Sequence, residues 1–186
     1  MKENILKVLF EEYVNGTPEK AVVIYKRISL CNLTYAVMRW INIEPENKNV
    51  FICSRVVKHL YDKKPAEEFN FLLEFLHKIV RYPDKIYKNQ DSKRGEFCFA
   101  KMINGQDYLC SLEVVKIPPV ILGVAQFGIS KFGQEKEMIE IHVVTAFRNR
   151  KSDKYLKNYT LLWDWGTGNP HRSALDTPKG STNAPQ

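Results

Sequence analysis

The sequence lacks the short motifs that mark common nucleotide-binding and hydrolytic sites. It contains no G-x-x-x-x-G-K-[ST] phosphate loop, no G-x-G-x-x-G dinucleotide motif and no G-x-S-x-G nucleophile elbow. It also has no H-E-x-x-H pair and no dense acidic cluster, and its four cysteines form no C-x-x-C pair. These absences disfavour phosphate-loop nucleotide hydrolysis, serine hydrolysis and a zinc site. We therefore predict neither a cofactor nor a metal ion.

Long apolar runs and a secretion signal are absent as well. No run of about 18 apolar residues occurs, which predicts no membrane span. The N-terminal stretch carries Glu3, Glu11 and Glu12 and no small-residue cleavage site, so it is typical of an amphipathic helix and not of a signal peptide. The cysteines lie far apart in apolar stretches, where buried, reduced thiols are expected. These features predict a cytoplasmic protein.

The sequence does contain an excess of positive charge on an ordinary globular composition. Its 186 residues are 44% hydrophobic, and the net charge of +7 with a pI of about 9.2 favours an anionic partner, of which nucleic acid is the commonest. The length suits one domain over residues 1–165 with a substantial core. Residues 166–186 are rich in Gly, Pro, Ser, Thr and Asn, which predicts a flexible tail.

Helical spacing of apolar residues dominates the first half of the chain. It predicts an N-terminal helix within residues 1–16 and a long helix that starts at Pro65, a favoured first helical position, and stops before Pro83. Ser54 is placed to cap a further helix that runs to about Tyr61, because its hydroxyl can accept from the free N–H groups of the first turn.

The β-rich runs lie mostly in the second half. Two short strands are expected early, at 20–28 and 50–53, and the run 30–40 between them is ambiguous and suits a short helix. Four runs follow residue 84, at 85–89, 96–103, 108–117 and 138–147. The segment 118–134 suits either a strand or a loop. Helices followed by strands predict an α+β fold with the N-terminal helices packed on a curved, mainly antiparallel sheet.

A site made of His, Arg, Lys, Thr and Tyr side chains suits metal-independent RNA cleavage. The 2′-hydroxyl of RNA is an internal nucleophile, so the protein need only move protons and stabilise the extra negative charge. Of the four histidines, His171 falls in the tail, His77 is expected on a solvated helix face and His142 lies in a strand. His59 remains, and it lies in the basic segment 55–64.

Three stretches then carry a resemblance to a known family. They are VFICSRVVKHLYDKKP at 50–65, FLLEFLHKIVRYPDKIYKN at 71–89 and EMIEIHVVTAFRNRKSDKYLKNYTLLW at 137–163. Together they resemble the phage-associated branch of the barnase–EndoU–colicin–RelE-like nuclease superfamily (BECR fold), in the same order over roughly residues 18–163. One departure is that this chain has Lys64, before a proline, where the family pattern has a second histidine.

The resemblance implies a curved sheet with a cleft and metal-independent ribonuclease activity, as in the toxin of a phage or mobile element. It implies RNA, including tRNA, as substrate and an antitoxin or immunity protein as partner. It makes His59 the acid or base and Thr145 a phosphate-orienting hydroxyl. Strand alternation puts Thr145 on the face of Ile141 and Val143.

The expected site adds cations to these two residues. Arg55 lies one helical turn before His59 and shares its face. The expected catalytic residues are His59, Thr145, Arg148 and Arg55, and the expected RNA-binding residues are Lys58, Lys63, Lys64, Arg150, Lys154 and Tyr155. Two rival interpretations stay open: a catalytically inactive RNA binder on the same fold, and a partner-binding or regulatory module. Tyr155 and Trp163, expected on a last helix, would in the simplest case close the core.

Overall fold

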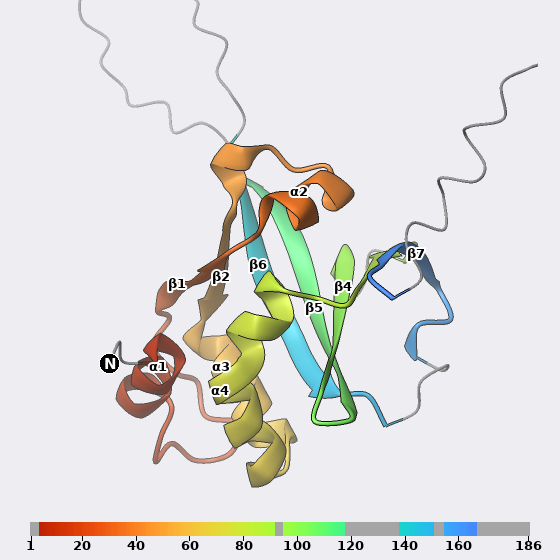
Figure 1. Ribbon diagram of the computed structural model, residues 1–186. Helices are drawn as coiled ribbons and strands as arrows, with labels where there is room; N and C mark the ends of the chain where they lie inside the picture. Colours follow the sequence, from red (N-terminus) through yellow and green to blue (C-terminus); the bar gives the residue numbers. More distant parts are fainter. Residues whose placement is uncertain (1–3, 92–94, 118–137, 151–154, 167–186) are drawn as a thin grey trace, which may run out of the picture.

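The computed structural model describes residues 4–91, 95–117, 138–150 and 155–166 (Figure 1). Its α-helices are α1 (Ile5–Tyr13), α2 (Tyr35–Ile41), α3 (Ser54–Lys63) and α4 (Ala66–Arg81). Its strands are β1 (Arg27–Asn32), β2 (Asn49–Cys53), β3 (Lys85–Asn89), β4 (Phe97–Ile103), β5 (Gln106–Ile117), β6 (Met138–Arg148) and β7 (Tyr159–Asp164). A short 3-10 helix, Pro45–Asn47, precedes β2.

The described strands form one open sheet in the order β1-β2-β6-β5-β4-β3-β7. Neighbouring strands are antiparallel except β2 and β6, which run parallel. Figure 1 shows α1, α3 and α4 gathered on one face of this sheet. The fold class expected from the sequence, α+β with helices packed on a mainly antiparallel sheet, is confirmed.

Helix α4 supplies the centre of the hydrophobic core. Leu72, Leu76 and Ile79 are buried in one cluster with Ile52 of β2 and Phe99 of β4. Burial of each such side chain contributes roughly 1.5–3 kcal/mol relative to leaving it in water. The predicted apolar stripe is therefore the core-facing side of α4. The helix itself begins one residue later than expected, with the preceding proline in the N-cap position.

The predicted N-terminal helix is confirmed as α1, and Asn104 and Gly105 form the β4–β5 turn. The side chain of Asn4 caps α1 by accepting a hydrogen bond from the backbone N–H of Leu6 at 3.0 Å. Asn104 and Gly105 both have positive φ angles, 52° and 72°. These angles are typical of the two-residue turns that match the twist of a β-hairpin.

The strand expected at 20–28 is wrong in its position. The observed strand β1 starts at Arg27, which pairs with Cys53, the last residue of β2. Because the chain turns into α3 directly after Cys53, residues 21–26 have no neighbouring strand to pair with. They run without regular structure, and Val22 and Ile24 are largely exposed.

The predicted capping role of Ser54 is also wrong. Ser54 is the first residue of α3, the residue before it occupies the N-cap, and no side chain caps this helix. The Ser54 hydroxyl instead donates to the backbone oxygen of Ile24 at 2.6 Å and accepts from the backbone N–H of Lys26 at 2.9 Å. It thereby ties the irregular segment before β1 to the start of α3.

A bulge in β6 changes the direction of Thr145. In the β5–β6 ladder Ser111 pairs with Thr145 but Leu112 pairs with Val143, so Val144 is the extra residue. Val143 faces the helix-side core, whereas the bulge turns Thr145 to the opposite face, which carries Phe147. The expected alternation, with Thr145 on the face of Val143, is therefore wrong, because it assumed an uninterrupted strand.

Trp163, which was expected on a last helix, lies in a strand. This strand is β7, where Trp163 pairs with Ile86 of β3. Of the helix expected at 154–156, Tyr155 is helical and Leu156 is not, and Lys154 lies outside the described residues. The segment 118–134 and the tail from residue 167 onward lie outside the described residues.

Candidate functional site

The outward side of α3 carries three side chains that can hold or take up positive charge. Arg55, His59 and Lys63 are spaced by four residues, so they lie one turn apart on the same helix face, and all three are exposed. The guanidinium carbon of Arg55 lies 5.5 Å from the ring centroid of Tyr25. Within the described residues, none of the three forms an ion pair and the His59 imidazole has no hydrogen bond. We call this set the α3 row.

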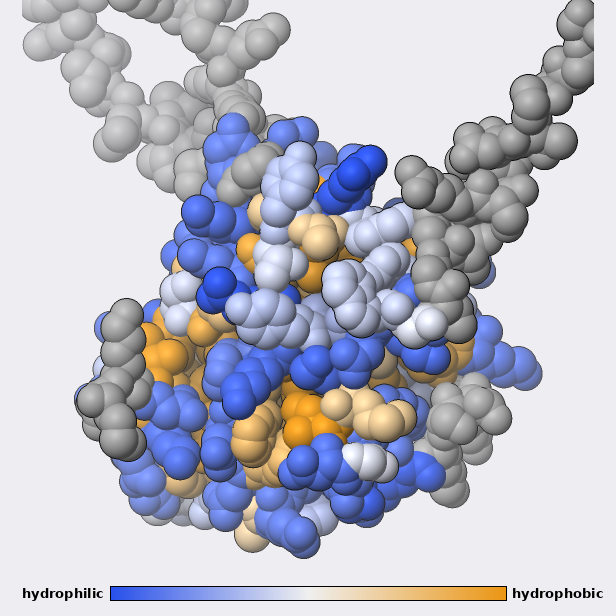
Figure 2. Space-filling view, viewed as in Figure 1, coloured by the Kyte–Doolittle hydropathy of each residue, from blue (hydrophilic) through white to orange (hydrophobic). Residues whose placement is uncertain are grey.

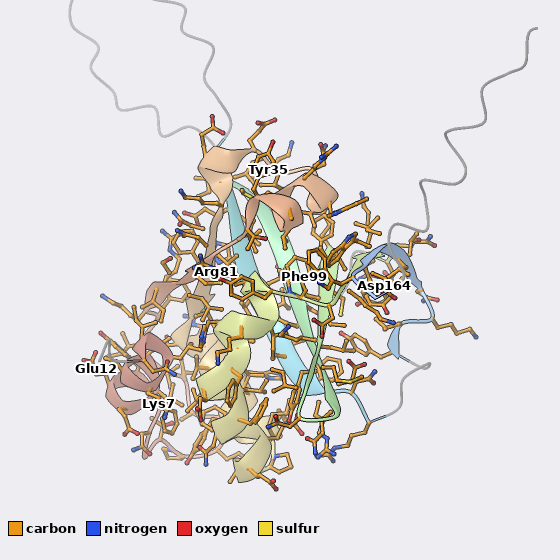
Figure 3. All side chains as sticks on the ribbon, viewed as in Figure 1. Lys7, Glu12, Tyr35, Arg81, Phe99 and Asp164 are labelled. Atoms are coloured by element: carbon orange, nitrogen blue, oxygen red, sulfur yellow. The ribbon has the colours of Figure 1, made fainter. Side chains whose placement is uncertain are left out.

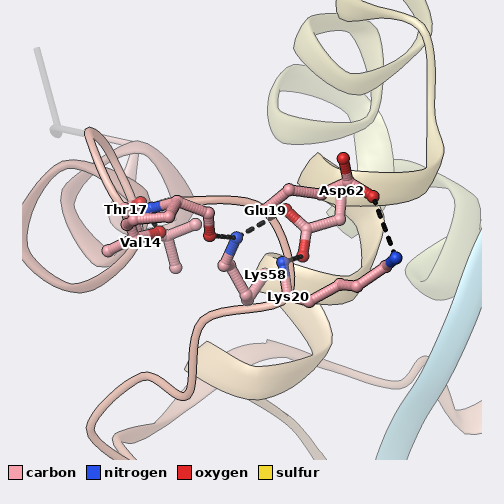
Figure 4. A network of polar contacts seen from close by, with 7 residues as sticks. Val14, Thr17, Glu19, Lys20, Lys58 and Asp62 are labelled. Atoms are coloured by element: carbon pink, nitrogen blue, oxygen red, sulfur yellow. Dashed lines mark hydrogen bonds and ion pairs between the residues drawn. The ribbon is translucent and has the colours of Figure 1, made fainter.

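Lys58, expected to bind RNA, is a structural residue. It is only 4% exposed. Its ammonium group donates to the backbone oxygen of Pro18 at 2.7 Å and to Asp62 at 2.5 Å, and Asp62 also accepts from the backbone N–H of Lys20 at 3.0 Å (Figure 4). The hydrogen bond from Lys58 lowers the pKa of Asp62. The prediction for Lys58 is wrong because this side chain turns toward the loop after α1.

Glu68, near the start of α4, gathers three of the predicted basic residues. Its buried carboxylate accepts from the backbone N–H of Arg148 at 3.0 Å and from the guanidinium of Arg150 at 3.0 Å. The ammonium group of Lys64 lies 3.9 Å from the same carboxylate. Glu68 therefore neutralises part of the positive charge of Lys64 and Arg150. The exposed guanidinium of Arg148 is not neutralised in this way, because Arg148 contacts Glu68 through its backbone N–H. We call these four residues the Glu68 cluster.

Lys64 is the one lysine of this cluster, and its side chain is only 19% exposed. Its ammonium group lies 5.0 Å from the ring centroid of Phe147. Loss of water lowers the pKa of Lys64, and the charge of Arg150 lowers it further, while the carboxylate of Glu68 opposes the change. Lys64 therefore releases a proton more readily than an ordinary surface lysine, at the position where the resembling family has its second histidine.

Thr145 and Tyr155 lie on the sheet face that the helices leave uncovered. Thr145 is half-buried and sits opposite Ser111 in the ladder, and the Ser111 hydroxyl lies 3.2 Å from the phenol oxygen of Tyr155. The ring of Tyr155 packs edge-on against Phe147, with centroids 4.5 Å apart. The aromatic ring of Tyr155 is therefore engaged in packing against Phe147. Burial and the neighbouring Tyr155 raise the pKa of Tyr159, which stacks on it.

The predicted catalytic residues thus occupy three places. Arg55 and His59 meet on the α3 row, Arg148 belongs to the Glu68 cluster, and Thr145 lies on the uncovered sheet face. Within the described residues, no hydrogen bond or ion pair joins His59 to Arg148 or to Thr145. Because Lys64 contacts Phe147, the Glu68 cluster lies next to the uncovered sheet face. Lys154 lies outside the described residues.

The cysteines are free, and burial makes three of them unreactive. It raises the pKa of Cys98 and of Cys31 to about 12 and the pKa of Cys110 well above its ordinary value, so at neutral pH none of the three carries the thiolate that nucleophilic chemistry requires. In the described part of the chain, no three His, Cys, Asp or Glu side chains are grouped so that they could hold a metal ion. Nor is any described helix long and apolar enough to cross a membrane.

Comparison of the chain with protein-family models, curated proteins and solved structures gave no match. The class that the fold defines is α+β with an open, mainly antiparallel sheet, and the assignment to a nuclease family stays a prediction.

One site escaped the sequence analysis altogether. A pocket of about 380 Å³ is lined by Trp40 of α2, Arg81 and Tyr82 at the end of α4, and Trp163 and Trp165 at the end of β7. The sequence analysis treated Trp163 as a core residue. The available signal was that the chain has only three tryptophans, and all three line this one pocket.

Proposed function

We propose that the protein binds RNA along the α3 row and cleaves it without a metal ion, with His59 as the proton-transfer group. The observation that carries this proposal is the α3 row itself: an exposed imidazole with an exposed cation one turn before it and another one turn after it. Both cations are unpaired within the described residues, so their charge is available to phosphate.

The chemistry asked of the α3 row is limited to protons and charge. The 2′-hydroxyl attacks the adjacent phosphorus, the bond to the 5′-oxygen breaks, and a 2′,3′-cyclic phosphate and a free 5′-hydroxyl result. His59 takes the proton of the 2′-hydroxyl or gives one to the leaving oxygen, because an imidazole exchanges protons near neutral pH. Arg55 and Lys63 would stabilise the extra negative charge of the phosphate.

Lys64 is the second proton-transfer candidate. Its lowered pKa suits it to donate a proton to the leaving oxygen better than an ordinary lysine would. Thr145 lies beyond it on the uncovered sheet face, and Arg148 lies in the same cluster as Lys64. RNA that passes from the α3 row to the end of β6 would meet these residues in turn.

The test is cleavage of a labelled single-stranded RNA by the pure protein in the presence of EDTA. Because His59 would move a proton in the transition state, His59→Ala should slow cleavage by roughly 10²–10⁴-fold. A matched control is His77→Gln on α4, which should cleave normally. The products should carry a 2′,3′-cyclic phosphate. Full activity of His59→Ala, or strict dependence on a divalent ion, would contradict the proposal.

A second candidate function is RNA binding without cleavage. It is favoured by one observation: within the described residues no carboxylate or second imidazole orients the ring of His59. The same experiment separates the two functions. Salt-sensitive binding with intact RNA after long incubation would support the binder, and absence of RNA binding would favour a partner-binding module.

The cellular role that accompanies the proposal is that of a toxin acting on cytoplasmic RNA, including tRNA. An antitoxin or immunity protein would then have to cover the α3 row, and acidic side chains would suit it. Induced expression in a bacterial host should arrest growth, and His59→Ala should relieve the arrest. Equal growth arrest by both proteins would separate toxicity from the α3 row.

A further inference from the structure

The pocket lined by Trp40, Arg81, Tyr82, Trp163 and Trp165 is held in shape by the chain around it. The indole rings of Trp163 and Trp165 meet edge-on, with centroids 4.7 Å apart. Trp165 is 71% exposed, yet its backbone N–H donates to the backbone oxygen of Asp84 at 2.9 Å. The exposed indole of Trp165 thus contacts the buried indole of Trp163, and the hydrogen bond holds its backbone beside Asp84. We call this site the tryptophan pocket.

The tryptophan pocket opens to solvent between α2 and the end of α4. Figure 2 shows pale, near-neutral side chains gathered there around a small apolar patch. Figure 3 shows Arg81 where α4 ends and Asp164 on β7 beside the pocket. Asp164 is paired with Lys85 at 3.1 Å, and this ion pair joins β7 to β3 next to the two C-terminal tryptophans.

The charge of the tryptophan pocket is positive. Asp84, its carboxylate, accepts from the ammonium group of Lys101 at 3.0 Å and from the backbone N–H of Met102 at 2.8 Å, so its charge is balanced. Lys101 also donates to the backbone oxygen of Tyr82 at 2.6 Å. Arg81 lies over the ring of Tyr82, 5.4 Å from its centroid, and within the described residues it has no carboxylate partner.

The aromatic walls and the positive charge of the tryptophan pocket limit the kinds of ligand that it can bind. Tryptophan faces stack on planar rings, and a volume of about 380 Å³ lies within the usual range of small-molecule sites. Aromatic walls also suit quaternary ammonium ions, but such a cation would meet the unpaired Arg81 and a carboxylate already neutralised. A planar ring that carries a negative group satisfies both the indoles and the guanidinium, since guanidinium binds phosphate with two parallel hydrogen bonds.

We infer that the tryptophan pocket binds a nucleobase together with its phosphate, with the base stacked on the indoles and the phosphate on Arg81. The ligand comes either from a free nucleotide or from one base of an RNA strand. The inference does not depend on RNA cleavage, because it concerns residues outside the α3 row and the Glu68 cluster. If the protein does not cleave RNA, the inference on the tryptophan pocket still stands. If the pocket binds no nucleotide, the proposed cleavage is unaffected.

Tryptophan fluorescence of the full chain measures occupancy directly. Since all three tryptophans line the tryptophan pocket, the emission reports on this site alone. Adenosine 5′-monophosphate should quench it in a saturable way. Adenosine, which lacks the phosphate, should bind on the order of tenfold more weakly, the loss expected for a charge-assisted hydrogen-bonded pair.

Two variants assign the two halves of the ligand. Arg81→Gln should weaken adenosine 5′-monophosphate on the order of tenfold and leave adenosine unchanged. Trp165→Ala should weaken both on the order of tenfold, because it removes a stacking face. The matched control is Arg39→Gln, an exposed arginine of α2 that does not line the pocket and changes the net charge equally. A thermal melt of each variant checks that it folds.

A single-stranded adenine hexanucleotide distinguishes the two sources. Binding much tighter than that of the mononucleotide, and weakened by Trp165→Ala, would identify a base of an RNA strand, whereas equal binding would identify a free nucleotide. Both results support the inference. It is overturned by equal affinity for adenosine 5′-monophosphate and adenosine, by an unchanged Arg81→Gln variant, by preferential binding of choline, or by absence of quenching.

Discussion

The α3 row and the tryptophan pocket both present unpaired arginine to solvent, but they are built in opposite ways. The row is convex, lies on one helix and has no walls, so it can hold a polyanion only through charge. The pocket is concave and aromatic, and its parts come from α2, the end of α4, β4 and β7. Charge on a convex surface gives affinity that salt weakens, whereas in the pocket only the contact between phosphate and Arg81 should weaken with salt and the stacking of the base should depend on it little.

The largest expected effect separates two kinds of basic residue on α3, the buried Lys58 and the exposed Lys63. Lys58→Ala should lower the free energy of unfolding by about 3 kcal/mol, because it leaves the Asp62 carboxylate without its buried partner. Lys63→Ala, on the exposed side of the same helix, should change it by less than about 0.5 kcal/mol. Urea unfolding of the two variants measures both numbers. Equal, small effects would mean that the Lys58–Asp62 pair contributes nothing to the fold.

A second comparison concerns salt. Arg55→Ala/Lys63→Ala should reduce the slope of log affinity for RNA against log salt by about 2, since two phosphate contacts are lost. Lys7→Ala/Lys88→Ala removes the same charge from exposed positions on α1 and β3, and should leave the slope unchanged. Filter binding or fluorescence anisotropy at several salt concentrations measures it. An equal loss in both double variants would point to net charge and not to the α3 row.

Substitutions in the Glu68 cluster should change the salt dependence of RNA affinity by an intermediate amount, between the change in the α3 double variant and that in the control double variant. Arg148→Ala/Arg150→Ala should flatten the same salt slope by less than the α3 double variant, because Glu68 already balances part of the charge of Arg150. The single variant Arg148→Ala should account for most of the change. An unchanged slope would place the path of the phosphates elsewhere.

The smallest expected effect links His77 to the tryptophan pocket. Partial burial, followed by the charges of Lys78 and Arg81, lowers the pKa of His77 from its ordinary 6.5. Arg81→Gln, or phosphate bound at Arg81, should raise that pKa slightly, which an NMR titration of the imidazole would detect. Arg39→Gln is the control, and an unchanged pKa in Arg81→Gln would show that the two residues are uncoupled.

The same histidine gives stability a small pH dependence. Since the folded protein holds a proton on His77 less readily than the unfolded chain does, stability falls as the pH drops below about 6.5 and levels off below the folded pKa. His77→Gln should remove this component, which is well below about 1 kcal/mol for a half-exposed group. A series of urea unfolding curves between pH 5 and 8 checks it.

Periodicity predicted those parts of the fold that depend on neighbours in sequence. The stripe of α4 and the strands β3 to β6 follow from local spacing, whereas β7, where a helix was expected, does not. The errors arose where a distant segment decides. Thr145 changes face because β5 imposes a bulge, Lys58 is buried because the loop after α1 offers Pro18, and β1 starts late because β2 ends.

The candidate site divides in the same manner. The α3 row is contiguous in the chain, so helical spacing alone was enough to group Arg55 with His59. The tryptophan pocket joins residues 40, 81–84, 101 and 163–165, and no local pattern connects them. The pocket forms where tertiary packing brings α2 against β7, so no spacing of residues along the sequence predicts it.

The late start of β1 also bears on how the protein behaves at high concentration. Among the described strands, β1 has a neighbour on one side only, and exposed Val22, Ile24 and Tyr25 precede it. An unpaired strand edge beside exposed apolar side chains is a template for self-association. Lys26 interrupts it with charge, whereas the charge of Arg27 is paired with Glu140. Lys26 therefore opposes self-association at this edge, and concentrated salt, which screens its charge, should promote aggregation of the protein.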